Sequence, residues 1–358
     1  AERVEPRASS ERAAPRASVR RMRRPVEHLG VGAVVIGRNE GERLATCIGS
    51  LLGRVEHVVY VDSASVDRSV SIARSMGVEV VELADDLPLS AGRGRNEGVR
   101  ALRRSRPDLE LVFFIDGDCE LVPGFLEEAC DVLRDREDVA VVCGRRRERR
   151  PDASIYNRLC EIEWAGPEGE VEACGGDAVI RIRAFEEVGG FDPSLIAGEE
   201  PDLCLRLRRE GYRVYRLSRD MTLHDAAMTR FSEWWRRAER AGHAFTEGAM
   251  KHRRGAEGYW MKEAIRPWVY GAMIPAAALL GALPSFGLSL GLLFVYPVSG
   301  YRAYESFRRR GFSSQESALA ASYCVLGRFP ELVGSARFLS ARARGRARTL
   351  IEYKGVTS

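Results

Sequence analysis

The sequence predicts an α/β protein with a central, mostly parallel sheet, followed by a C-terminal helical region. Over the first half of the chain, short apolar runs alternate with amphipathic stretches across short links, as in sheets with crossover helices. One run, 111–115, shows no polar alternation and ends in Asp116-Gly117-Asp118, which is typical of a strand buried on both faces. Later in the chain, the segment 267–301 carries no charged residue.

Composition and charge indicate a folded chain with two basic ends. Its 358 residues are enough for one large or two smaller domains, and the net charge of +4 is small. Arginine supplies nearly all the basic charge and gathers near both termini, which suits an anionic membrane surface or nucleic acid. The eight cysteines form no CxxC pair. A zinc site or disulfide framework is therefore not expected, and a reducing cytoplasm fits the chain.

The first half opens with strand–helix alternation. Strands are expected at 31–36, 55–61 and 78–83, with helices at 42–52 and 69–76 between them. Residues 89–98 form a basic, glycine-rich stretch, which we interpret as a loop entering a helix at 99–104. In this loop Arg93 or Arg95 can pair with a diphosphate. The segment is not a P-loop, because the GK[ST] ending is absent.

The second half continues the pattern with less regular links. A helix is expected at 125–133 and strands at 139–143, 172–180 and 214–217, and the arginine run 144–150 reads as a solvated edge. Near residue 200 a helix begins with crowded acids, ends with arginines and is capped by Gly211. Helix capping alone explains Asp202.

Four acids are expected at the carboxyl ends of strands, where open α/β sheets bind ligands. Asp116 and Asp118 can converge on one point, and as hard oxygen ligands they suit Mg²⁺ or Mn²⁺ bridging to phosphates. Glu40 and Asp62 can accept hydrogen bonds from a ribose or a base. Each acid also has a plain structural interpretation, as a polar turn residue or a helix N-cap.

These motifs, in this order, resemble a family 2 glycosyltransferase of the GT-A (nucleotide-diphospho-sugar transferase) fold. The resemblance covers roughly residues 31–245. It rests on an ordered set of segments, which are Val34 to Glu40, Val61 to Ser65, Arg95 to Gly98, Asp116 to Asp118, Val188 to Asp192, and Gly198 to Glu200 with Arg206.

The resemblance implies a hexosyltransferase-like enzyme that moves a sugar from a nucleotide diphosphate donor with inversion. It assigns donor binding to Glu40, Asp62, Arg95, Asp116 and Asp118, and metal binding to Asp118, Asp116 and His224. The cofactor is then Mn²⁺ or Mg²⁺. Glu200 falls on the catalytic base, where the family usually has aspartate, which leaves the choice between Glu200 and Glu199 open. Asp177, Trp234 and Trp235 are candidates for the acceptor site.

We divide the chain into a basic disordered tail (1–28), a GT-A catalytic domain (29–250) and a helical region (251–358) with an apolar hairpin at about 267–301. Prolines break this apolar segment into pieces shorter than the ~20 residues of a spanning helix. It therefore predicts either a hairpin of short helices or a shallow re-entrant insertion, with a soluble helix pair as the alternative. Basic residues flank both ends, which favours a return to the cytoplasmic side of the cell membrane.

The preferred hypothesis is a membrane-associated inverting glycosyltransferase acting on a lipid-linked sugar, a glycolipid or a polysaccharide in cell-envelope biosynthesis. Nucleic acid is not an expected partner, because no recognition motif accompanies the basic tail. Two alternatives remain at this point. One is a nucleotidyltransferase of similar fold, and the other is a non-catalytic membrane scaffold that binds nucleotide or glycan.

Overall fold

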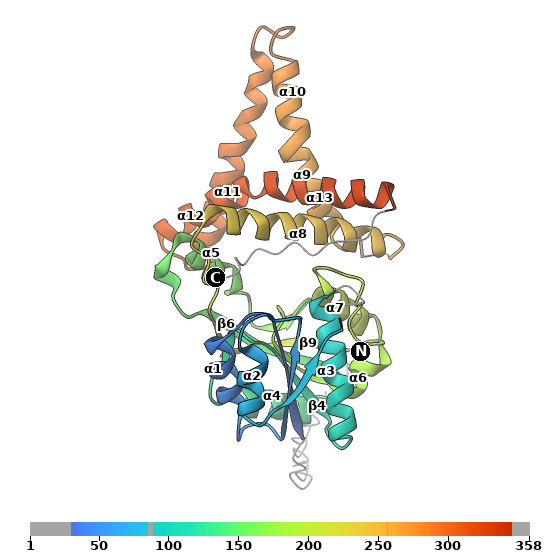
Figure 1. Cartoon of the computed structure of the whole chain (residues 1–358). Helices are drawn as coiled ribbons and strands as arrows, with labels where there is room; N and C mark the ends of the chain where they lie inside the picture. The colour runs from blue at the N-terminus through green and yellow to red at the C-terminus, as the bar shows by residue number, and fades with distance from the viewer. Residues whose placement is uncertain (1–29, 85–88, 256, 346–358) are drawn as a thin grey trace, which may run out of the picture.

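The computed structural model of the protein describes residues 30–84, 89–255 and 257–345, so the predicted tail at 1–28 lies outside the described residues. Figure 1 shows a body built around a sheet, a layer of helices lying across one end of it, and a helical hairpin that projects from this layer. The architecture confirms the predicted α/β class, but the sheet is mixed where a mostly parallel one was expected.

The body is organised on a nine-stranded sheet with the order β3-β2-β1-β4-β8-β6-β9-β5, and β7 pairs with β9. The strands are β1 (Val31–Gly37), β2 (His57–Asp62), β3 (Glu79–Glu82), β4 (Leu111–Asp116), β5 (Cys119–Leu121), β6 (Val139–Glu148), β7 (Gly169–Val171), β8 (Ala178–Arg181) and β9 (Arg213–His224). The body helices are α1 (Glu42–Leu51), α2 (Ser69–Ser75), α3 (Ala91–Ser105), α4 (Phe125–Asp135), η1 (Pro151–Ala153), α5 (Ile155–Trp164), α6 (Ile182–Glu187) and α7 (Glu199–Arg209).

The first four strands of the order run parallel and bring the predicted acids to one edge. β1 pairs with β2 and with β4 in parallel, and the register places Gly37 opposite Asp62 and Ile36 opposite Asp116. The first five residues of β4 are fully buried, as expected of a strand with both faces covered. Beyond β4 the sheet becomes antiparallel at β8.

Three segments differ from the sequence-based expectation. The strand expected at 172–180 begins only at Ala178, as β8. The glycine-rich stretch 91–98 is not a loop but the first half of α3, because the Ser90 hydroxyl caps the helix by accepting a hydrogen bond from Arg93 N–H at 3.2 Å. The arginine run is not a solvated edge either. It continues β6 as far as Glu148, paired with β9 through register shifts, and strand alternation turns successive arginines to opposite faces.

The C-terminal region forms the helical layer and the hairpin. Its elements are α8 (Phe231–Lys251), α9 (Met261–Trp268), a π-helix (η2, Val269–Met273), α10 (Ile274–Leu280), a 3-10 helix (η3, Leu288–Phe294), α11 (Val295–Arg309), α12 (Ser314–Leu326) and α13 (Arg328–Ala343). The arginine-rich end of the chain is helical up to Ala343 and packs on α8 as part of α13.

The helices α8 and α13 cross at two glycines. A Cβ on Gly242 would lie 2.0 Å from the Glu331 carbonyl oxygen, and one on Gly334 would lie 1.9 Å from the Glu239 carbonyl oxygen. Only glycine lets the two backbones approach this closely. Arg337 and Glu239 form an ion pair beside the crossing. Since α8 also carries side chains toward the body, this crossing fixes the position of the helical layer.

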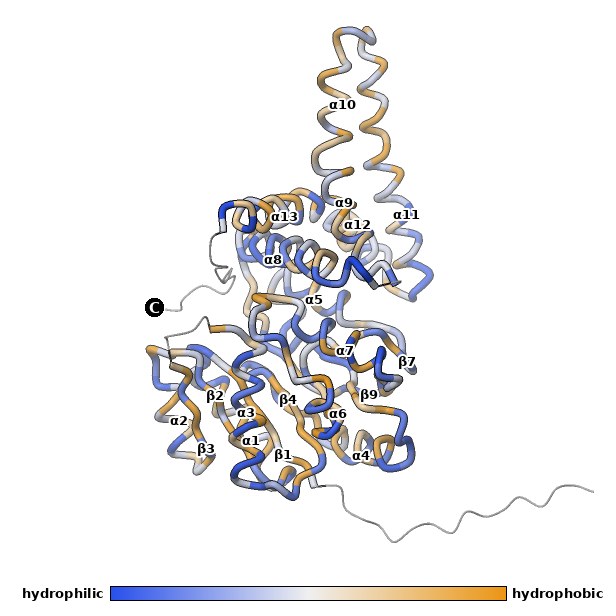
Figure 2. Tube along the Cα trace, turned by 90° about the vertical axis from the view of Figure 1, so that its right-hand side faces the viewer, coloured by the Kyte–Doolittle hydropathy of each residue, from blue (hydrophilic) through white to orange (hydrophobic). Residues whose placement is uncertain are grey.

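The hairpin stands clear of the rest of the molecule and is largely apolar at its far end (Figures 1 and 2). Leu280, Leu283 and Phe286 are 82%, 90% and 98% exposed. Contiguous apolar surface of this kind marks an interaction site. Within the described part of the chain, no helix combines the length and the hydropathy needed to cross a bilayer.

We predict that Gly242→Ala destabilises the fold, because the added methyl group meets backbone atoms of α13 that cannot move aside. Overpacking of this kind costs about 1–3 kcal/mol, measurable by chemical denaturation. Gly300→Ala is the matched control, since its Cβ would only touch Val325 at 3.7 Å and alanine favours a helix by up to ~1 kcal/mol. Equal stabilities of the two variants would contradict the tight crossing.

Candidate active site

Asp116 ends β4 between two guanidinium groups. Arg95 from α3 lies 2.8 Å from its Oδ1, and Arg146 from β6 lies 3.5 Å from its Oδ2. Arg95 also pairs with Glu199 at 2.8 Å. Burial alone would lower the pKa of Arg95, but Asp116 and Glu199 raise it above its ordinary value. The site thus holds two fixed positive charges at the carboxyl edge of the parallel strands, where an anionic ligand is expected.

Asp177 lies behind Asp116 and holds it in place. It is fully buried, and its Oδ1 accepts a hydrogen bond from Asp116 N–H at 3.1 Å. The Thr222 hydroxyl donates to its Oδ2 at 2.7 Å, and Arg146 pairs with its Oδ1 at 2.8 Å. We expected Asp177 at the acceptor site. The structure instead places it beneath the cavity wall, where it braces β4 and β6 and has no surface to offer an acceptor.

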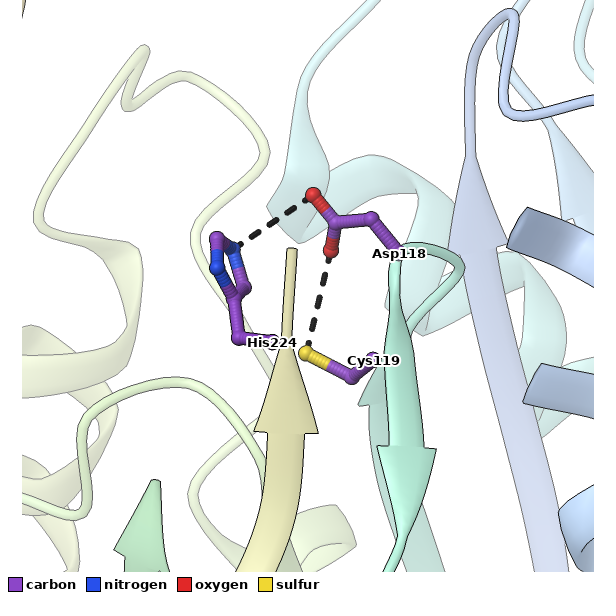
Figure 3. A group of neighbouring side chains, drawn as sticks. All are labelled: Asp118, Cys119 and His224. Atoms are coloured by element: carbon purple, nitrogen blue, oxygen red, sulfur yellow. Dashed lines mark hydrogen bonds and ion pairs between the residues drawn. The ribbon is translucent and has the colours of Figure 1, made fainter. Parts of the chain in front are cut away.

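Asp118 lies two residues after Asp116, in the turn between β4 and β5, and faces His224 at the end of β9 (Figure 3). Its Oδ2 lies 3.4 Å from His224 Nε2, and its Oδ1 lies 3.7 Å from Cys119 Sγ. On the far side of the imidazole ring, Glu148 Oε2 lies 3.6 Å from Nδ1. This buried carboxylate lies beyond hydrogen-bond length from Nδ1, which has no hydrogen-bond partner among the described residues.

The donor set of Asp118 and His224 fits a divalent ion. A carboxylate and an imidazole are ligands that Mn²⁺ accepts, whereas a hard ion does not favour a thiol. Cys119 completes a group of three potential ligands whose atoms lie within 4.8 Å of one another, but burial raises the pKa of its thiol well above the ordinary value. Cys119 is buried and is not among the residues that line the cavity. Of the three predicted metal ligands, the structure brings Asp118 and His224 together, whereas Asp116 is not part of this group of potential ligands.

The acids of the Gly198-Glu199-Glu200 turn point in different directions. Gly198 has φ +80°, and a Cβ there would lie 2.9 Å from the Trp260 ring, so glycine is needed to start α7 at this point. Glu199 turns to Arg95, as described above. Glu200 is buried, and its Oε1 accepts a hydrogen bond from Cys174 N–H at 2.5 Å.

The second contact of Glu200 is with a thiol. Cys204 lies one turn further along α7, and its Sγ is 3.1 Å from the same Oε1. Both contacts therefore fix one oxygen of the carboxylate, and Glu200 also lines the main cavity. Glu199 is engaged by a guanidinium, whereas Glu200 is held by two neutral donors. Of the two acids, the geometry favours Glu200 as a proton acceptor.

The two acids assigned to the nucleoside lie at the ends of β1 and β2. Glu40 lines the cavity and pairs with Arg43 at 2.8 Å. Asp62 is buried and accepts hydrogen bonds from the Tyr60 hydroxyl at 2.7 Å and from Ser65 N–H at 2.8 Å. Asp62 thus shapes the loop after β2, while its neighbour Ser63 lines the cavity. Direct contact of Asp62 with a base stays a prediction.

A cavity of about 960 Å³ joins these groups. It is lined by Glu40, Arg95, Asp116, Asp118, Glu199, Glu200 and His224, and it extends to side chains of α5, α8, α11, α12 and α13. Trp234 lines it as well, but is buried with its ring edge-on to Tyr323 at 4.7 Å between centroids. Trp235 is partly buried and packs against the small apolar cluster to which Trp234 belongs. The cavity has room for a nucleotide-sized ligand and part of a second molecule.

Sequence reasoning missed two residues of the site. Arg146 lies in a run of arginines that reads as surface, yet its guanidinium also sits 5.6 Å from the centre of the Trp164 ring. Trp164 in turn meets His224 edge-on at 4.8 Å between centroids. The burial of Arg146 could have been anticipated from the alternation of side chains along a strand. If residues 145–147 form a strand, the middle side chain points to the opposite face from its two neighbours.

We predict that Arg146→Met is strongly destabilising, because it leaves Asp177 buried without its cation. Removing one partner of a buried pair costs about 3–5 kcal/mol. Arg145→Met is the control, because Arg145 is 40% exposed where it pairs with Glu161 and such pairs contribute about 0–1 kcal/mol. Urea denaturation of both variants measures the difference, and similar losses would show that Arg146 is not the buried counterion.

The comparisons with known proteins agree with this geometry. Residues 33–187 match the family model described as Glycosyl transferase family 2, and no match was found among curated protein sequences. Among solved structures, the mannosyltransferase PcManGT from Pyrobaculum calidifontis, in complex with GDP-Man and Mn²⁺, shares 19% identity over 82% of this chain and 86% of that chain, with a TM-score of 0.53. S. aureus TarS 1–349 shares 14% identity over 88% and 92% of the two chains, with a TM-score of 0.49.

The nucleotidyltransferase and scaffold alternatives are thereby set aside. Residues 33–187 form a family 2 glycosyltransferase domain of the GT-A type, and the protein is a glycosyltransferase.

Proposed function

We propose that the protein is an inverting, metal-dependent glycosyltransferase that moves a sugar from a nucleotide diphosphate donor to a lipid-linked sugar, a glycolipid or a polysaccharide. The observation that carries the proposal is the shared cavity, which holds the Asp118–His224 pair, the Arg95–Asp116–Arg146 cluster and Glu200. Metal ligands, diphosphate-pairing cations and a proton acceptor are the groups that a single displacement at an anomeric carbon requires.

Asp118 and His224 are the residues that would hold Mn²⁺ or Mg²⁺. When bound, the ion neutralises charge on the diphosphate leaving group. The two arginines beside Asp116 add fixed positive charge at the same edge of the sheet without any reorganisation. The similar mannosyltransferase PcManGT was solved in complex with GDP-Man and Mn²⁺, which supports this class of donor and ion.

Glu200 is the proposed base. Cys174 N–H and the Cys204 thiol hold its Oε1, so the carboxylate is oriented before the acceptor arrives. An acceptor hydroxyl in the cavity passes its proton to Glu200 as its oxygen attacks the anomeric carbon. The longer glutamate side chain, where the family usually has aspartate, is accommodated because α7 begins at Gly198 and the carboxylate folds back toward Cys174.

We predict that Glu200→Gln lowers kcat by about 10²–10⁴-fold, as expected for loss of a general base, with little change in donor affinity. Glu199→Gln removes the acid that pairs with Arg95, so its main effect is on the KM for the donor. Turnover of UDP-, GDP- and dTDP-sugars with Mn²⁺ measures both variants. A larger kcat loss in Glu199→Gln than in Glu200→Gln would move the base to Glu199.

The hairpin supports placement on the cytoplasmic face of the cell membrane. Its apolar end is exposed, and basic residues flank the apolar segment along the chain on both sides, which are Arg253, Arg254, Lys262, Arg266, Arg302, Arg308, Arg309 and Arg310. Cations at this level attract anionic headgroups while apolar residues enter the hydrocarbon. The proposal is insertion into the membrane from one side, because both limbs of the hairpin return to the helical layer (Figure 1).

We predict that the double variant Leu283→Asp/Phe286→Asp abolishes flotation with phosphatidylserine-containing vesicles. Each buried acid costs about 2.5–3.5 kcal/mol in the bilayer, so partitioning falls by more than about a hundredfold. Val66→Asp is the control, since Val66 is 85% exposed on the catalytic body. Release of the unaltered protein by high salt, with no effect of the double substitution, would indicate surface binding alone.

A further inference from the structure

Two cysteines and the proposed base form a compact group beside the main cavity. Cys174 lies in the loop between β7 and β8, and Cys204 lies one turn after Glu200 on α7. All three side chains are buried. The two sulfur atoms lie 3.9 Å apart, and Cys204 Sγ lies 3.1 Å from Glu200 Oε1. The cysteines are 30 residues apart in the sequence, so the fold assembles a thiol pair that no CxxC motif predicts.

The spacing of these atoms matches a tetrahedral site for a thiophilic ion. Zinc–thiolate bonds of ~2.3 Å at tetrahedral angles place two sulfur atoms about 3.8 Å apart, and a carboxylate oxygen at ~2.0 Å from the ion lies about 3.5 Å from each sulfur. The observed sulfur–sulfur distance of 3.9 Å agrees with the first value. The sulfur–oxygen distance of 3.1 Å has to lengthen only slightly. The three potential ligand atoms all lie within 4.8 Å of one another.

The group borders the cavity, although its thiols are buried. Glu200 lines the cavity, and so do Gly175 and Gly176, which directly follow Cys174. Neither glycine has a side chain that would stand between the cavity and the loop of Cys174. With three protein ligands, the fourth position of a tetrahedral ion is left for a water molecule from the cavity.

This group differs in its chemistry from the Asp118–His224 pair. The carboxylate and imidazole of that pair accept Mn²⁺, whereas two thiolates favour softer ions such as Zn²⁺. A single thiol, Cys119, belongs to the group around His224, whereas two thiols meet at Glu200. The number of thiolates bound to an ion therefore tells the two sites apart.

We propose that Cys174, Cys204 and Glu200 form a binding site for a thiophilic divalent ion such as Zn²⁺, and that an ion bound there inhibits the enzyme. Each thiol releases its proton to solvent when it binds the ion. The ion takes Glu200 Oε1, the oxygen that the Cys174 N–H and the Cys204 thiol contact in its absence. A carboxylate bound to a divalent ion is a weak proton acceptor. The metal site does not depend on the proposed function, and only the inhibition rests on Glu200 as the base.

Cd²⁺ binding to the reduced full chain tests the site, because Cd²⁺ is a softer ion of the same charge and its bonds to thiolates give an ultraviolet charge-transfer band. With excess Mg²⁺ present to occupy hard sites, we expect a band whose intensity corresponds to two thiolates per ion. No band, or a band of one thiolate per ion as expected from the exposed Cys324, would overturn the site. This readout needs no variant.

Two matched cysteine variants locate the Cd²⁺ site. Cys204→Ser removes a ligand and is expected to weaken binding by at least about tenfold. Cys119→Ser removes the thiol of the other group and is expected to leave the two-thiolate band and the affinity unchanged. Loss of the band in Cys119→Ser with its retention in Cys204→Ser would overturn the assignment to Glu200 and its two cysteines.

Turnover of nucleotide sugars in Mn²⁺ tests the inhibition, with each protein compared to its own rate without Zn²⁺. Half-inhibition of Cys204→Ser is expected to need at least about tenfold more Zn²⁺ than half-inhibition of the unaltered chain. Equal inhibition of both proteins would place the effect at the Asp118–His224 pair and overturn the inhibitory role. A two-thiolate Cd²⁺ band in a chain that turns over no donor would remove that role together with the proposed function and leave the metal site standing.

Discussion

The site depends on the charge cluster in which Asp116 lies between Arg95 and Arg146 with the buried Asp177 behind it. A buried carboxylate without a cation costs several kcal/mol, so these four groups are stable only together. They come from α3, β4, β6 and the turn before β8, and their mutual pairing fixes where those elements meet. The cluster thereby sets the carboxyl edge of the sheet from which Asp118 projects toward His224.

The helical layer links this edge to the exposed hairpin. α8 crosses α13 at Gly242 and Gly334, and Lys251 at its end pairs with Asp192 and Asp202 of the catalytic body at 2.7 and 2.6 Å. Asp202 also meets His252 at 2.7 Å, so this acid does more than begin a helix. Because α8 is held by α13 on one side and by ion pairs with the catalytic body on the other, the cavity beneath it keeps a defined shape. This cavity runs from the catalytic acids to the base of the hairpin.

Much of the catalytic half could be predicted from the sequence, because its signals are local. The buried β4, its Asp-Gly-Asp ending and the acidic start of α7 all follow from composition within a few residues. Arg146 could not be assigned in this way, since its burial depends on β6 pairing with the distant β9. Asp177 was misplaced for the same reason, because its partners Asp116, Arg146 and Thr222 are far away in sequence. The hairpin was anticipated from its missing charges, but its projection away from the body follows only from the packing of α8, α12 and α13.

The most direct test of the central claim is calorimetric titration of the unaltered chain and of Asp118→Ala with UDP and with GDP, each in Mn²⁺ and in EDTA. If the acids and arginines at the sheet edge form a donor site, one nucleoside diphosphate binds the unaltered chain about tenfold or more tightly in Mn²⁺ than in EDTA. The gain is lost in Asp118→Ala, because the variant lacks the carboxylate that faces His224. Binding of neither nucleotide, or equal binding with and without the ion, would contradict the metal-dependent donor site.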